Sequence, residues 1–308
     1  MDEIRLGSSG LRASRLAYGC WRIAQTDEQA RTTGRAALLA AVEAGYTFFD
    51  HADIYCHGRS EELFGRVLRE VSDLRGRVLI GSKCGVRPAD TPVAGAPYRY
   101  DASAEYIVES CEGSLRRLGV ETIDLYQLHR PDWLMIPDEV AAAFSRLREQ
   151  GKVREFGVSN FRPATCDVLQ RALSFPLVTN QVEISLANLA AFNDGTIDHC
   201  LSQRLTPMAW SPLGGGLLAD GASKLLPAQE SYDTAHMSAT LQQMADLRGV
   251  SRAELALAWL LRHPAGIVPI VGSTDPGRIR SCAAAVETPL SREEWYALLQ
   301  AALGSRLP

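Results

Sequence analysis

Apolar and polar residues follow one repeating order along this chain, in which a short apolar run precedes a longer segment of helical period. Most of the apolar runs are apolar on both faces, as strands covered by helices require. The eight predicted strands are 16–19, 47–49, 77–82, 123–128, 153–158, 178–182, 206–210 and 267–271. The predicted helices that alternate with them are 28–44, 60–71, 103–118, 137–150, 163–173, 196–204, 251–262 and 276–285.

The segment that begins at Ser103 shows the helical pattern most clearly. Ile107, Cys111 and Leu115 recur at four-residue steps and form one apolar stripe. Ser103 suits the N-cap position, and Gly119 stands where a helix would end. The segment is therefore predicted to be an amphipathic helix with its own start and stop signals.

Eight strand–helix units in a row predict a closed parallel (β/α)8 barrel, the TIM barrel, as a single domain over 1–308. An open doubly wound sheet is the rival fold, but the even spacing and the absence of a mid-chain linker disfavour it. Residues 4–19, IRLGSSGLRASRLAYG, predict an N-terminal β-hairpin because SSG is turn chemistry. Two extra helices are expected at 235–249 and 291–303, and two long loops at 84–102 and 211–234.

Composition narrows the class of protein without naming a function. With 46% hydrophobic and 22% charged residues, the 308-residue chain has the profile of an ordinary globular protein. A net charge of −4 without a basic cluster predicts no binding to nucleic acid or anionic membrane. The polar start and the lack of an apolar run near ~20 residues predict a cytoplasmic protein. The oligomeric state stays open between a monomer and a small homo-oligomer.

The cysteines give no sign of a metal site or of a disulfide framework. Seven of them are scattered along the chain, without a C-x-x-C pair or zinc-like spacing. We therefore expect reduced thiols in a reducing compartment, and no bound metal.

Four side chains with complementary proton chemistry lie at or after predicted strand ends. Asp50, Lys83 and His129 each follow a strand directly, and Tyr55 lies in the loop after the second strand. The carboxyl ends of barrel strands form the catalytic face of this fold. The barrel prediction therefore brings all four residues to one site, although the strands were chosen from apolarity alone.

The four residues together suit proton donation to a carbonyl oxygen. A tyrosine has a pKa near ~10, and a neighbouring ammonium lowers it. Lys83 can supply that ammonium, Asp50 can hold the lysine, and His129 can orient the carbonyl. Taken singly, an Asp at a strand end is often a cap, a Lys a solvated loop residue and a His a core residue. The coincidence of all four at or just after strand ends favours the catalytic interpretation.

Carbonyl reduction also needs a hydride carrier, which is usually a nicotinamide. Trp210 ends a predicted strand and can stack on a flat ring, or can instead pack at the barrel rim. Ser159, Asn160 and Gln181 are neutral hydrogen-bonding groups that suit a carboxamide. Ser159 and Asn160 can alternatively cap the following helix.

A phosphate-binding candidate follows the eighth strand in GSTDPGRIR. Gly272 and Ser273 leave backbone N–H groups open at a helix start, which attracts phosphate. Arg278 and Arg280 lie near that start, where an anion between them would offset the helix dipole; both can also be solvated arginines. The glycine run LGGGLLA at 213–219 lacks the acidic partner of a dinucleotide fingerprint, so we interpret it as a flexible loop over the cofactor.

These residues resemble the landmarks of the aldo-keto reductase family along nearly the whole chain. The matching motifs, in family order, are GYTFFDHADIY, SKCG, LYQLHRPD, FGVSNF, NQVE, WSPLGGG and IVGSTDPGRIR. The similarity is closest to the bacterial oxidoreductase branch that carries FFDHADIY. The resemblance implies an NADPH-dependent reductase that converts an aldehyde or ketone to an alcohol, with Tyr55 as the proton donor.

The resemblance also implies the site residues. The catalytic tetrad is Asp50, Tyr55, Lys83 and His129. The implied cofactor-binding residues are Trp21, Ser159, Asn160, Gln181, Trp210, Ser211, Leu213, Gly215, Gly272, Ser273, Thr274 and Arg278. From their positions we expect Trp21, Ile54, Trp133 and loop 84–102 to shape an apolar substrate pocket.

Three positions depart from the family pattern at the adenosine end of the cofactor. Asp275 stands where many members have Lys or Arg, and it can cap the helix or weaken binding of the 2′-phosphate. Ser281 and Cys282 stand where Glu and Asn often contact adenine. These departures leave NADH open as an alternative to NADPH.

Two other functions fit parts of the same sequence. A lyase in the same barrel class would use Lys83 to form a Schiff base with its substrate. A regulatory module would hold NADPH with little turnover, although the intact tetrad disfavours it. The identity of the carbonyl substrate is not specified by these motifs.

Overall fold

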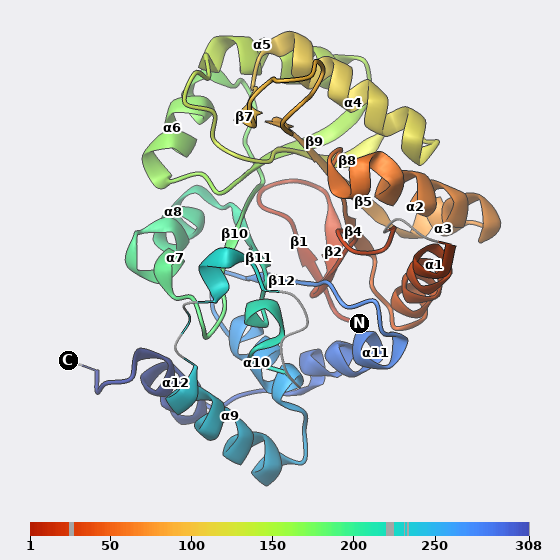
Figure 1. The fold of residues 1–308 in the computed structure, drawn as a ribbon. Helices are drawn as coiled ribbons and strands as arrows, with labels where there is room; N and C mark the ends of the chain where they lie inside the picture. The colour runs from red at the N-terminus through yellow and green to blue at the C-terminus, as the bar shows by residue number, and fades with distance from the viewer. Residues whose placement is uncertain (25–27, 220–224, 231, 233, 308) are drawn as a thin grey trace.

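The computed structural model describes residues 1–308 except 25–27, 220–224, 231, 233 and 308. Eight parallel strands close into a barrel in the order β10-β11-β12-β3-β4-β5-β8-β9 (Figure 1). The barrel strands are β3 (Ala17–Gly19), β4 (Phe48–Asp50), β5 (Leu79–Cys84), β8 (Ile123–Leu128), β9 (Val153–Ser159), β10 (Thr179–Glu183), β11 (Thr206–Trp210) and β12 (Val268–Val271). Because β12 pairs with β3, the sheet has no open edge, which excludes the doubly wound alternative.

The barrel strands match the eight apolar runs, and the largest differences lie at the two ends of β5. The sequence predicted this strand from residue 77, whereas the structure begins it at Leu79. Residues Leu74–Arg77 instead form a short helix, α3, in which Leu74 is fully buried. Arg77 therefore ends a helix instead of starting a strand. At its other end β5 continues to Cys84, so Lys83 lies inside the strand, where it pairs with Gln127 of β8, and the prediction that it follows the strand was wrong.

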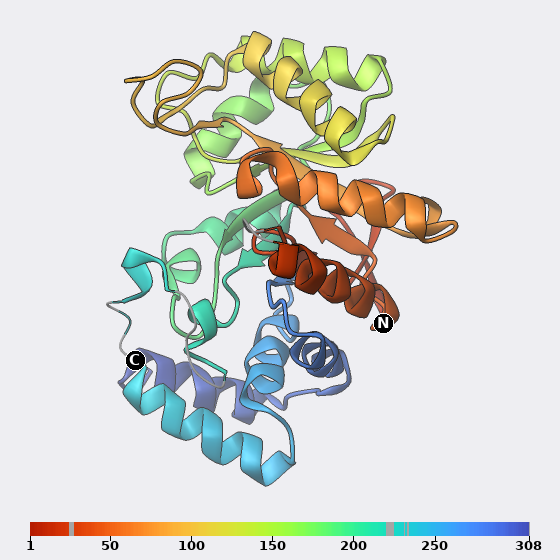
Figure 2. The same cartoon turned by 45° about the vertical axis from the view of Figure 1, so that its right-hand side comes forward.

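Helices form the outer layer, and α1, α2 and α4 lie side by side on it (Figure 2). The helix α4 has the predicted ends, since Ser103 accepts a hydrogen bond from the Tyr106 N–H and Gly119 adopts φ 68°. The helices alternating with the strands are α1 (Glu28–Glu43), α2 (Arg59–Glu70), α4 (Ala104–Leu118), α5 (Pro137–Glu149), α6 (Pro163–Ala172), α8 (Thr196–Gln203), α10 (Arg252–Leu261) and α11 (Pro276–Ala283). Short helical turns are α7 (Ala190–Asn193), η1 (Tyr55–Gly58), η2 (Gly214–Gly216), η3 (Pro227–Gln229) and η4 (Ala284–Glu287).

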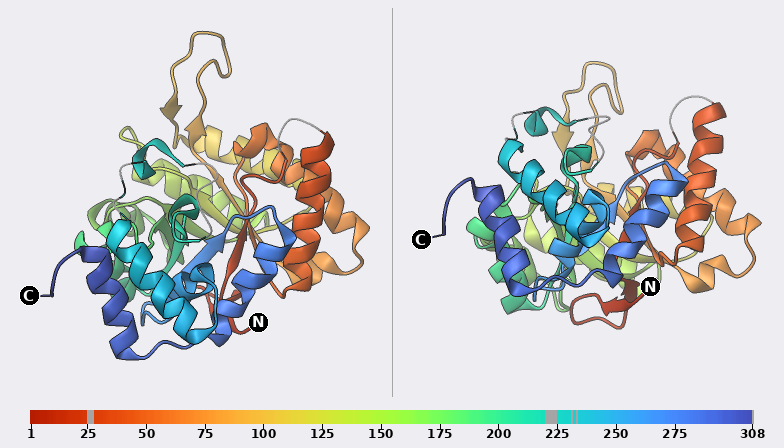
Figure 3. Two further views of the ribbon diagram at one scale, coloured as in Figure 1. Left: turned by 60° about the horizontal axis from the view of Figure 1, so that its bottom comes forward. Right: turned by 90° about the horizontal axis from the view of Figure 1, so that it is seen from below.

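The N-terminal hairpin closes one end of the barrel, as Figure 3 shows. Strands β1 (Glu3–Arg5) and β2 (Arg12–Ser14) pair antiparallel. Leu6 and Leu11 from the hairpin are almost fully buried and pack with Phe48 inside the barrel. This apolar plug covers the amino end of the barrel interior.

The loop 84–102 projects from the opposite end of the barrel (Figure 3) and contains a small antiparallel pair, β6 (Val86–Arg87) and β7 (Arg99–Tyr100). Arg87 pairs with Asp101 at 2.7 Å near its base. The sequence predicted a loop here, because strands of two residues have no detectable alternation.

The two extra helices, α9 (Ala235–Arg248) and α12 (Arg292–Leu303), pack together beside the barrel. Trp295 of α12 stacks on Trp259 of α10 with ring centroids 4.9 Å apart. Each indole N–H donates to the backbone carbonyl of the other residue, at 3.0 and 3.1 Å. This reciprocal pair buries both polar groups and fixes the C-terminal helix. Within the part of the chain that the structure describes, no helix is both long and apolar enough to cross a membrane.

Candidate active site

The four predicted catalytic residues meet at the carboxyl end of three neighbouring strands. Asp50 is the last residue of β4, Lys83 lies one residue before the end of β5, and His129 follows β8 directly. Tyr55 opens the short helix η1 in the loop after β4. Since β4, β5 and β8 are adjacent in the barrel, residues far apart in sequence come together.

Lys83 is the centre of this group. Its side chain is fully buried, and its Nζ lies 2.8 Å from Asp50 Oδ2 and 3.2 Å from the Tyr55 hydroxyl oxygen. A third contact joins Nζ to the backbone carbonyl of His51, at 2.8 Å. The three donors of the ammonium therefore each have an acceptor, and one of those acceptors is the phenol.

The backbone of the loop places Tyr55 over the lysine. The Asp53 N–H donates to the Lys83 carbonyl at 3.0 Å, and the Tyr55 N–H donates to the Ala52 carbonyl at 3.0 Å. Cys56 and His57 then adopt left-handed φ angles of 52° and 55°, which are uncommon for residues with a Cβ. The chain thus turns sharply after Tyr55 and leads into α2.

His129 completes the group from the next strand. Its ring centroid lies 5.7 Å from that of Tyr55 in an edge-to-face arrangement. The His129 N–H donates to the Cys84 carbonyl at 2.7 Å, which ties the residue to the end of β5. Burial, reinforced by the positive charges of Lys83 and Arg130, holds the pKa of His129 well below its usual range. The imidazole is therefore neutral and carries a single ring N–H at neutral pH.

Burial also sets the protonation of the other two groups. It raises the pKa of Tyr55 above its ordinary value, because its effect exceeds the opposite influence of Lys83. The expectation that Lys83 leaves the Tyr55 pKa below its ordinary value was therefore wrong, although the lysine does act in the lowering direction. For Lys83, burial alone would lower the pKa, but Asp50 and Tyr55 outweigh it and the pKa is raised. At neutral pH the site therefore holds the neutral phenol of Tyr55 beside the protonated Lys83.

A chain of hydrogen bonds joins the residues expected at the nicotinamide carboxamide to Asp50, the partner of Lys83. The Trp210 indole N–H donates to Asn160 Oδ1 at 3.0 Å, and Asn160 Nδ2 donates to Ser159 Oγ at 2.8 Å. The Ser159 hydroxyl donates to the Gln181 carbonyl at 2.8 Å, and Gln181 Nε2 donates to Asp50 Oδ1 at 2.9 Å. The structure thus brings these residues to one place, next to the tetrad. Trp210 is half-buried, with the Arg130 guanidinium 5.8 Å from its ring centroid.

The glycine run after β11 forms tight turns. Ser211 adopts a left-handed φ of 47°, and its carbonyl accepts from the Gly214 N–H at 2.8 Å. A Cβ on Gly215 would lie 2.7 Å from Gln229 Oε1, so a side chain has no room there. The loop expected over 213–219 contains a short helix, η2, between Leu213 and the fully buried Leu218. Part of the wider loop 211–234 lies outside the described residues.

The segment after β12 forms the start of α11, as predicted, and Asp275 is its N-cap. The Asp275 carboxylate accepts from the Arg278 N–H at 2.9 Å, and the Ser273 hydroxyl accepts from the Asp275 N–H at 3.1 Å. Gly272 and Arg278 are exposed, and Thr274 is half-buried. A negative charge therefore already occupies the helix start that was expected to attract phosphate.

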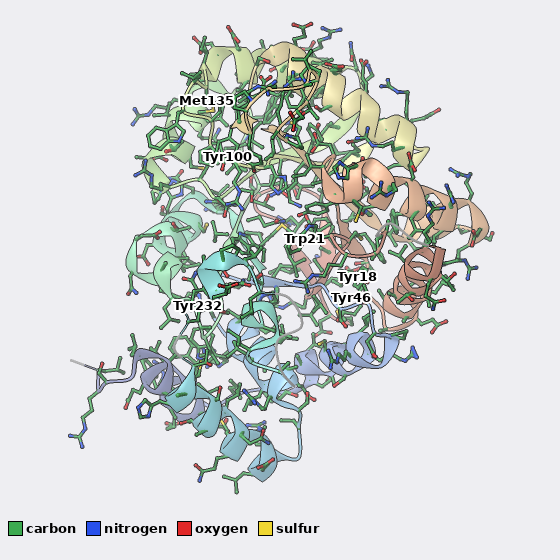
Figure 4. The ribbon with its side chains drawn as sticks, viewed as in Figure 1. Tyr18, Trp21, Tyr46, Tyr100, Met135 and Tyr232 are labelled. Carbon is green, nitrogen blue, oxygen red and sulfur yellow. The ribbon has the colours of Figure 1, made fainter. Side chains whose placement is uncertain are left out.

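Two buried tyrosines hold this segment, and sequence patterns did not reveal them. The Tyr18 hydroxyl donates to the Ser273 carbonyl at 2.9 Å, and the Tyr46 hydroxyl donates to the Ile279 carbonyl at 3.3 Å. Figure 4 shows both rings between the barrel and α11. Without these bonds the two hydroxyl groups would be unpaired in the core. Their role can be recognised only once the fold shows which backbone carbonyls lie beside them.

The residues expected to shape a substrate pocket differ in exposure. Trp21 is 45% exposed and is drawn near the middle of the barrel in Figure 4, with the Arg22 guanidinium 5.0 Å from its ring centroid. Ile54 is half-buried beside Tyr55, whereas Trp133 is 89% exposed. At the adenosine end, Ser281 is exposed but Cys282 is buried in the core, so its thiol packs inward.

Asp53 is a further titratable group beside the tetrad that sequence reasoning missed. Burial, together with the negative charge of Glu61, raises the pKa of Asp53 to about 7. Its Oδ1 is buried without a hydrogen-bond partner among the described residues, while the Tyr106 hydroxyl reaches Oδ2 at 3.5 Å. The sequence signal was its place in the tetrad motif, three residues after Asp50.

Comparison with known proteins agrees with this geometry. The chain matches the model of the Aldo/keto reductase family over residues 15–302. It is 43% identical to a 6-dehydroglucose reductase of Novosphingobium aromaticivorans, over 99% of this chain and 96% of the relative. A 6-dehydroglucose reductase of Agrobacterium fabrum is 39% identical over the full length of both chains.

A solved thermostable aldo-keto reductase in complex with the inhibitor epalrestat has a similar structure. It superposes with a TM-score of 0.83 and 26% identity, covering 98% of this chain and all of the other. Since the fold, the family model and these relatives agree over nearly the whole length, the chain belongs to the aldo/keto reductase family and is an oxidoreductase.

Proposed function

We propose that this enzyme reduces a carbonyl group with a nicotinamide cofactor and that Tyr55 donates the proton. The observation that carries the proposal is the Lys83 ammonium, which contacts Asp50 at 2.8 Å and the Tyr55 hydroxyl at 3.2 Å. An ammonium fixed in this way stabilises the phenolate that remains after the proton has left. It therefore lowers the barrier for transfer to a developing alkoxide.

The protonation states support the reduction direction. Because the pKa of Tyr55 is raised, the phenol still holds its proton at neutral pH, as a donor must. His129 is neutral because its pKa is lowered, so its ring N–H is available to a carbonyl oxygen without a net charge. Tyr55 and His129 then act on the same oxygen, one as the acid and the other as a hydrogen-bond donor.

The residues at the carboxyl end fit a nicotinamide. The side-chain carbonyl of Gln181 accepts no hydrogen bond from the described residues, so it is available to a carboxamide –NH₂. Ser159 and Asn160 lie beside it, and the half-buried Trp210 offers a ring face. When bound, the nicotinamide supplies the hydride for the carbonyl carbon. The pyrophosphate contacts would come from Ser211, Leu213 and Gly215.

We further propose NADPH as the main cofactor, with NADH also accepted. Gly272, Ser273, Thr274 and Arg278 would contact the 2′-phosphate and adenosine, and the exposed Arg278 offers a cation there. The Asp275 carboxylate lies at the same helix start and opposes a phosphate. The preference for NADPH over NADH is therefore expected to be small.

The names of two relatives suggest the substrate. Both are 6-dehydroglucose reductases, and this chain is 43% and 39% identical to them over almost the whole length. We propose that the enzyme acts on 6-dehydroglucose or a similar sugar aldehyde. The exposed ring of Trp21 provides an apolar face near the middle of the barrel, and such faces pack against the C–H groups of sugars.

Turnover of 6-dehydroglucose tests this proposal. The purified enzyme is mixed with the sugar and with either NADPH or NADH, and cofactor oxidation is followed by absorbance while glucose formation is measured separately. We expect matched consumption and product, with a kcat/KM for the sugar well above that for simple aliphatic aldehydes. Equal rates with all aldehydes would refute the sugar as substrate, and an absence of oxidation with any carbonyl would refute the reductase itself.

The structure disfavours the Schiff-base lyase. A lysine nucleophile needs a lowered pKa and a free amine, whereas the pKa of Lys83 is raised and its Nζ donates three hydrogen bonds. The regulatory-module alternative is disfavoured by the same intact ion pair, since a protein that only holds cofactor has no need of it.

A further inference from the structure

A depression with more basic than acidic side chains lies at the end of the barrel opposite the tetrad. It has a volume of about 610 Å³, and its wall includes Thr47, Leu79 and Thr122 at the amino ends of β4, β5 and β8. These strands carry Asp50 and Lys83 near their other ends. The depression is therefore separated from the proposed active site by the length of the barrel.

The charge of this depression differs in sign from that of the whole chain. Four arginines and two acidic residues line it, although the chain as a whole carries a net charge of −4. The charged lining residues are Arg12, Arg75, Arg77, Arg154, Glu3 and Asp124. An excess of arginine in a concave site raises the local concentration of anions.

Asp124 is the buried anchor of the cluster. Its side chain is 1% exposed and lies 3.1 Å from Arg75 Nη2 and 2.8 Å from Arg154 Nη1. The Ile80 N–H also donates to it, at 2.9 Å. Arg75 has two further contacts, because its Nη1 and Nη2 donate to the carbonyls of Val78 and Thr122. The carboxylate therefore fixes two guanidinium groups at the wall.

The other arginines keep donors that no described residue uses. Arg154 is 51% exposed and contacts Asp124 through one nitrogen only, and Arg12 is 60% exposed and contacts Glu3 through its Nε. Arg77 is exposed and has no hydrogen bond or ion pair with any residue that the structure describes. Cβ atoms placed on Gly76 and Gly151 would meet nothing within 4 Å, so the lining glycines leave the space open.

We propose that this depression is a second binding site, for a small molecule that carries at least two phosphate or carboxylate groups. Guanidinium groups bind both kinds of anion through paired N–H donors. A volume of about 610 Å³ is that of a small-molecule site. The net negative charge of the chain argues against an extended polyanion, because its flanking charges would be repelled.

Isothermal titration with inorganic tripolyphosphate, and separately with citrate, tests the proposal. The full-length protein is saturated with NADP⁺ beforehand, so that the proposed cofactor site is filled. Measurements use low ionic strength, because exposed arginines are screened by salt. We expect one additional anion per chain, with an affinity that falls as salt is added. Binding of tripolyphosphate alone assigns a phosphate site, and binding of citrate alone assigns a carboxylate site.

Matched variants locate the bound ion. Arg77→Gln removes an unpaired surface guanidinium and should weaken binding at least fivefold without affecting folding, and Arg154→Gln should weaken it further. Arg306→Gln, an exposed arginine outside the depression, should leave the affinity within twofold. If neither tripolyphosphate nor citrate bound, the proposal would be overturned. Binding that Arg278→Gln abolishes but Arg77→Gln does not would also overturn it, because the ion would then occupy the proposed cofactor site.

Discussion

Each end of the barrel buries one carboxylate and pairs it with cations, but the two clusters differ in the exposure of those cations. At the carboxyl end, Asp50 pairs with Lys83, whose side chain is 0% exposed and whose remaining donors face the His51 carbonyl and the Tyr55 phenol. At the amino end, Asp124 pairs with Arg75 and Arg154, which are 36% and 51% exposed.

The difference shows that solvent exposure decides whether an ion pair influences a nearby catalytic group or only holds side chains in place. A fully buried ammonium interacts strongly with the titratable groups beside it, because little solvent screens the charge. A partly exposed guanidinium is screened and acts mainly as a hydrogen-bond donor. The same pairing of opposite charges can therefore stabilise the phenolate of Tyr55 at the carboxyl end of the barrel and hold Arg75 and Arg154 in place at the amino end.

The largest effect is expected from removing the buried cation. Lys83→Met should lower kcat by about 10³-fold or more, because the phenolate loses its stabilising charge. It should also destabilise the fold by about 3–5 kcal/mol, since Asp50 stays buried without its partner. Steady-state kinetics and urea unfolding measure the two effects.

Lys152→Met is the matched control for that change. Lys152 pairs with Glu112 at 2.7 Å, but both side chains are about one-third exposed. Its loss should cost less than about 1 kcal/mol and should leave kcat unchanged. If the two lysine variants behaved alike, burial would not distinguish the two kinds of ion pair.

Asp53 provides the contrasting case of a carboxylate that forms no ion pair with the residues the structure describes, although Arg117 acts on its pKa from farther away. With its pKa raised to about 7, the folded protein holds a proton that the unfolded chain releases near pH 4. The folded state therefore binds more protons between about pH 4 and 7, and this residue makes the protein less stable as pH rises through that window.

Asp53→Asn should remove this decline. The stability of the wild type relative to the variant should fall by up to about 4 kcal/mol from pH 4 to pH 8, an upper bound because the residue is partly exposed. Urea unfolding of both proteins at several pH values gives the difference. Parallel profiles would show that Asp53 titrates normally in the fold.

Neutralising the carboxylate at the amino end should affect stability by a smaller amount. Asp124→Asn keeps the size of the side chain but removes its charge from two arginines that water can still reach. We expect a loss of about 2 kcal/mol in the free energy of unfolding. The exposed Asp138→Asn serves as the control and should change stability by under about 0.5 kcal/mol. A loss as large as that of Lys83→Met would mean that the arginines are as poorly solvated as the lysine.

The smallest effect concerns an exposed carboxylate. Asp275→Ser keeps a capping side chain for α11 but removes the negative charge at its start. The ratio of kcat/KM for NADPH to that for NADH should rise about three- to tenfold, since the opposing charge is partly screened by solvent. Parallel kinetics with both cofactors check this, and an unchanged ratio would place the 2′-phosphate away from Asp275.

The sequence predicted the barrel and the meeting of the tetrad, because strand ends are marked by apolar runs that stop at Asp50 and before His129. It misplaced the start of β5, since the turn at Leu74–Arg77 has no helical period to recognise. The His51 carbonyl on Lys83 was also beyond prediction, because any residue carries such a group.

The basic depression was invisible in the sequence for another reason. Its arginines come from β2, α3 and β9 and are separated by up to 142 positions, so no local cluster forms along the chain. The balance between burial and charge at Tyr55 was equally hidden, because it depends on the packing of several loops and not on residue types. Local sequence patterns do not show which distant residues come together or how deeply each side chain is buried.

The most direct test of the proton-donor assignment is the single-turnover rate of hydride transfer in Tyr55→Phe, compared with Tyr106→Phe. Tyr106 lies near the same end, where its hydroxyl donates to the Val86 carbonyl at 3.2 Å. Tyr55→Phe should slow the step by about 10²–10⁴-fold with cofactor affinity unchanged, whereas Tyr106→Phe should stay within about threefold of wild type. Near-normal hydride transfer in Tyr55→Phe would contradict the account.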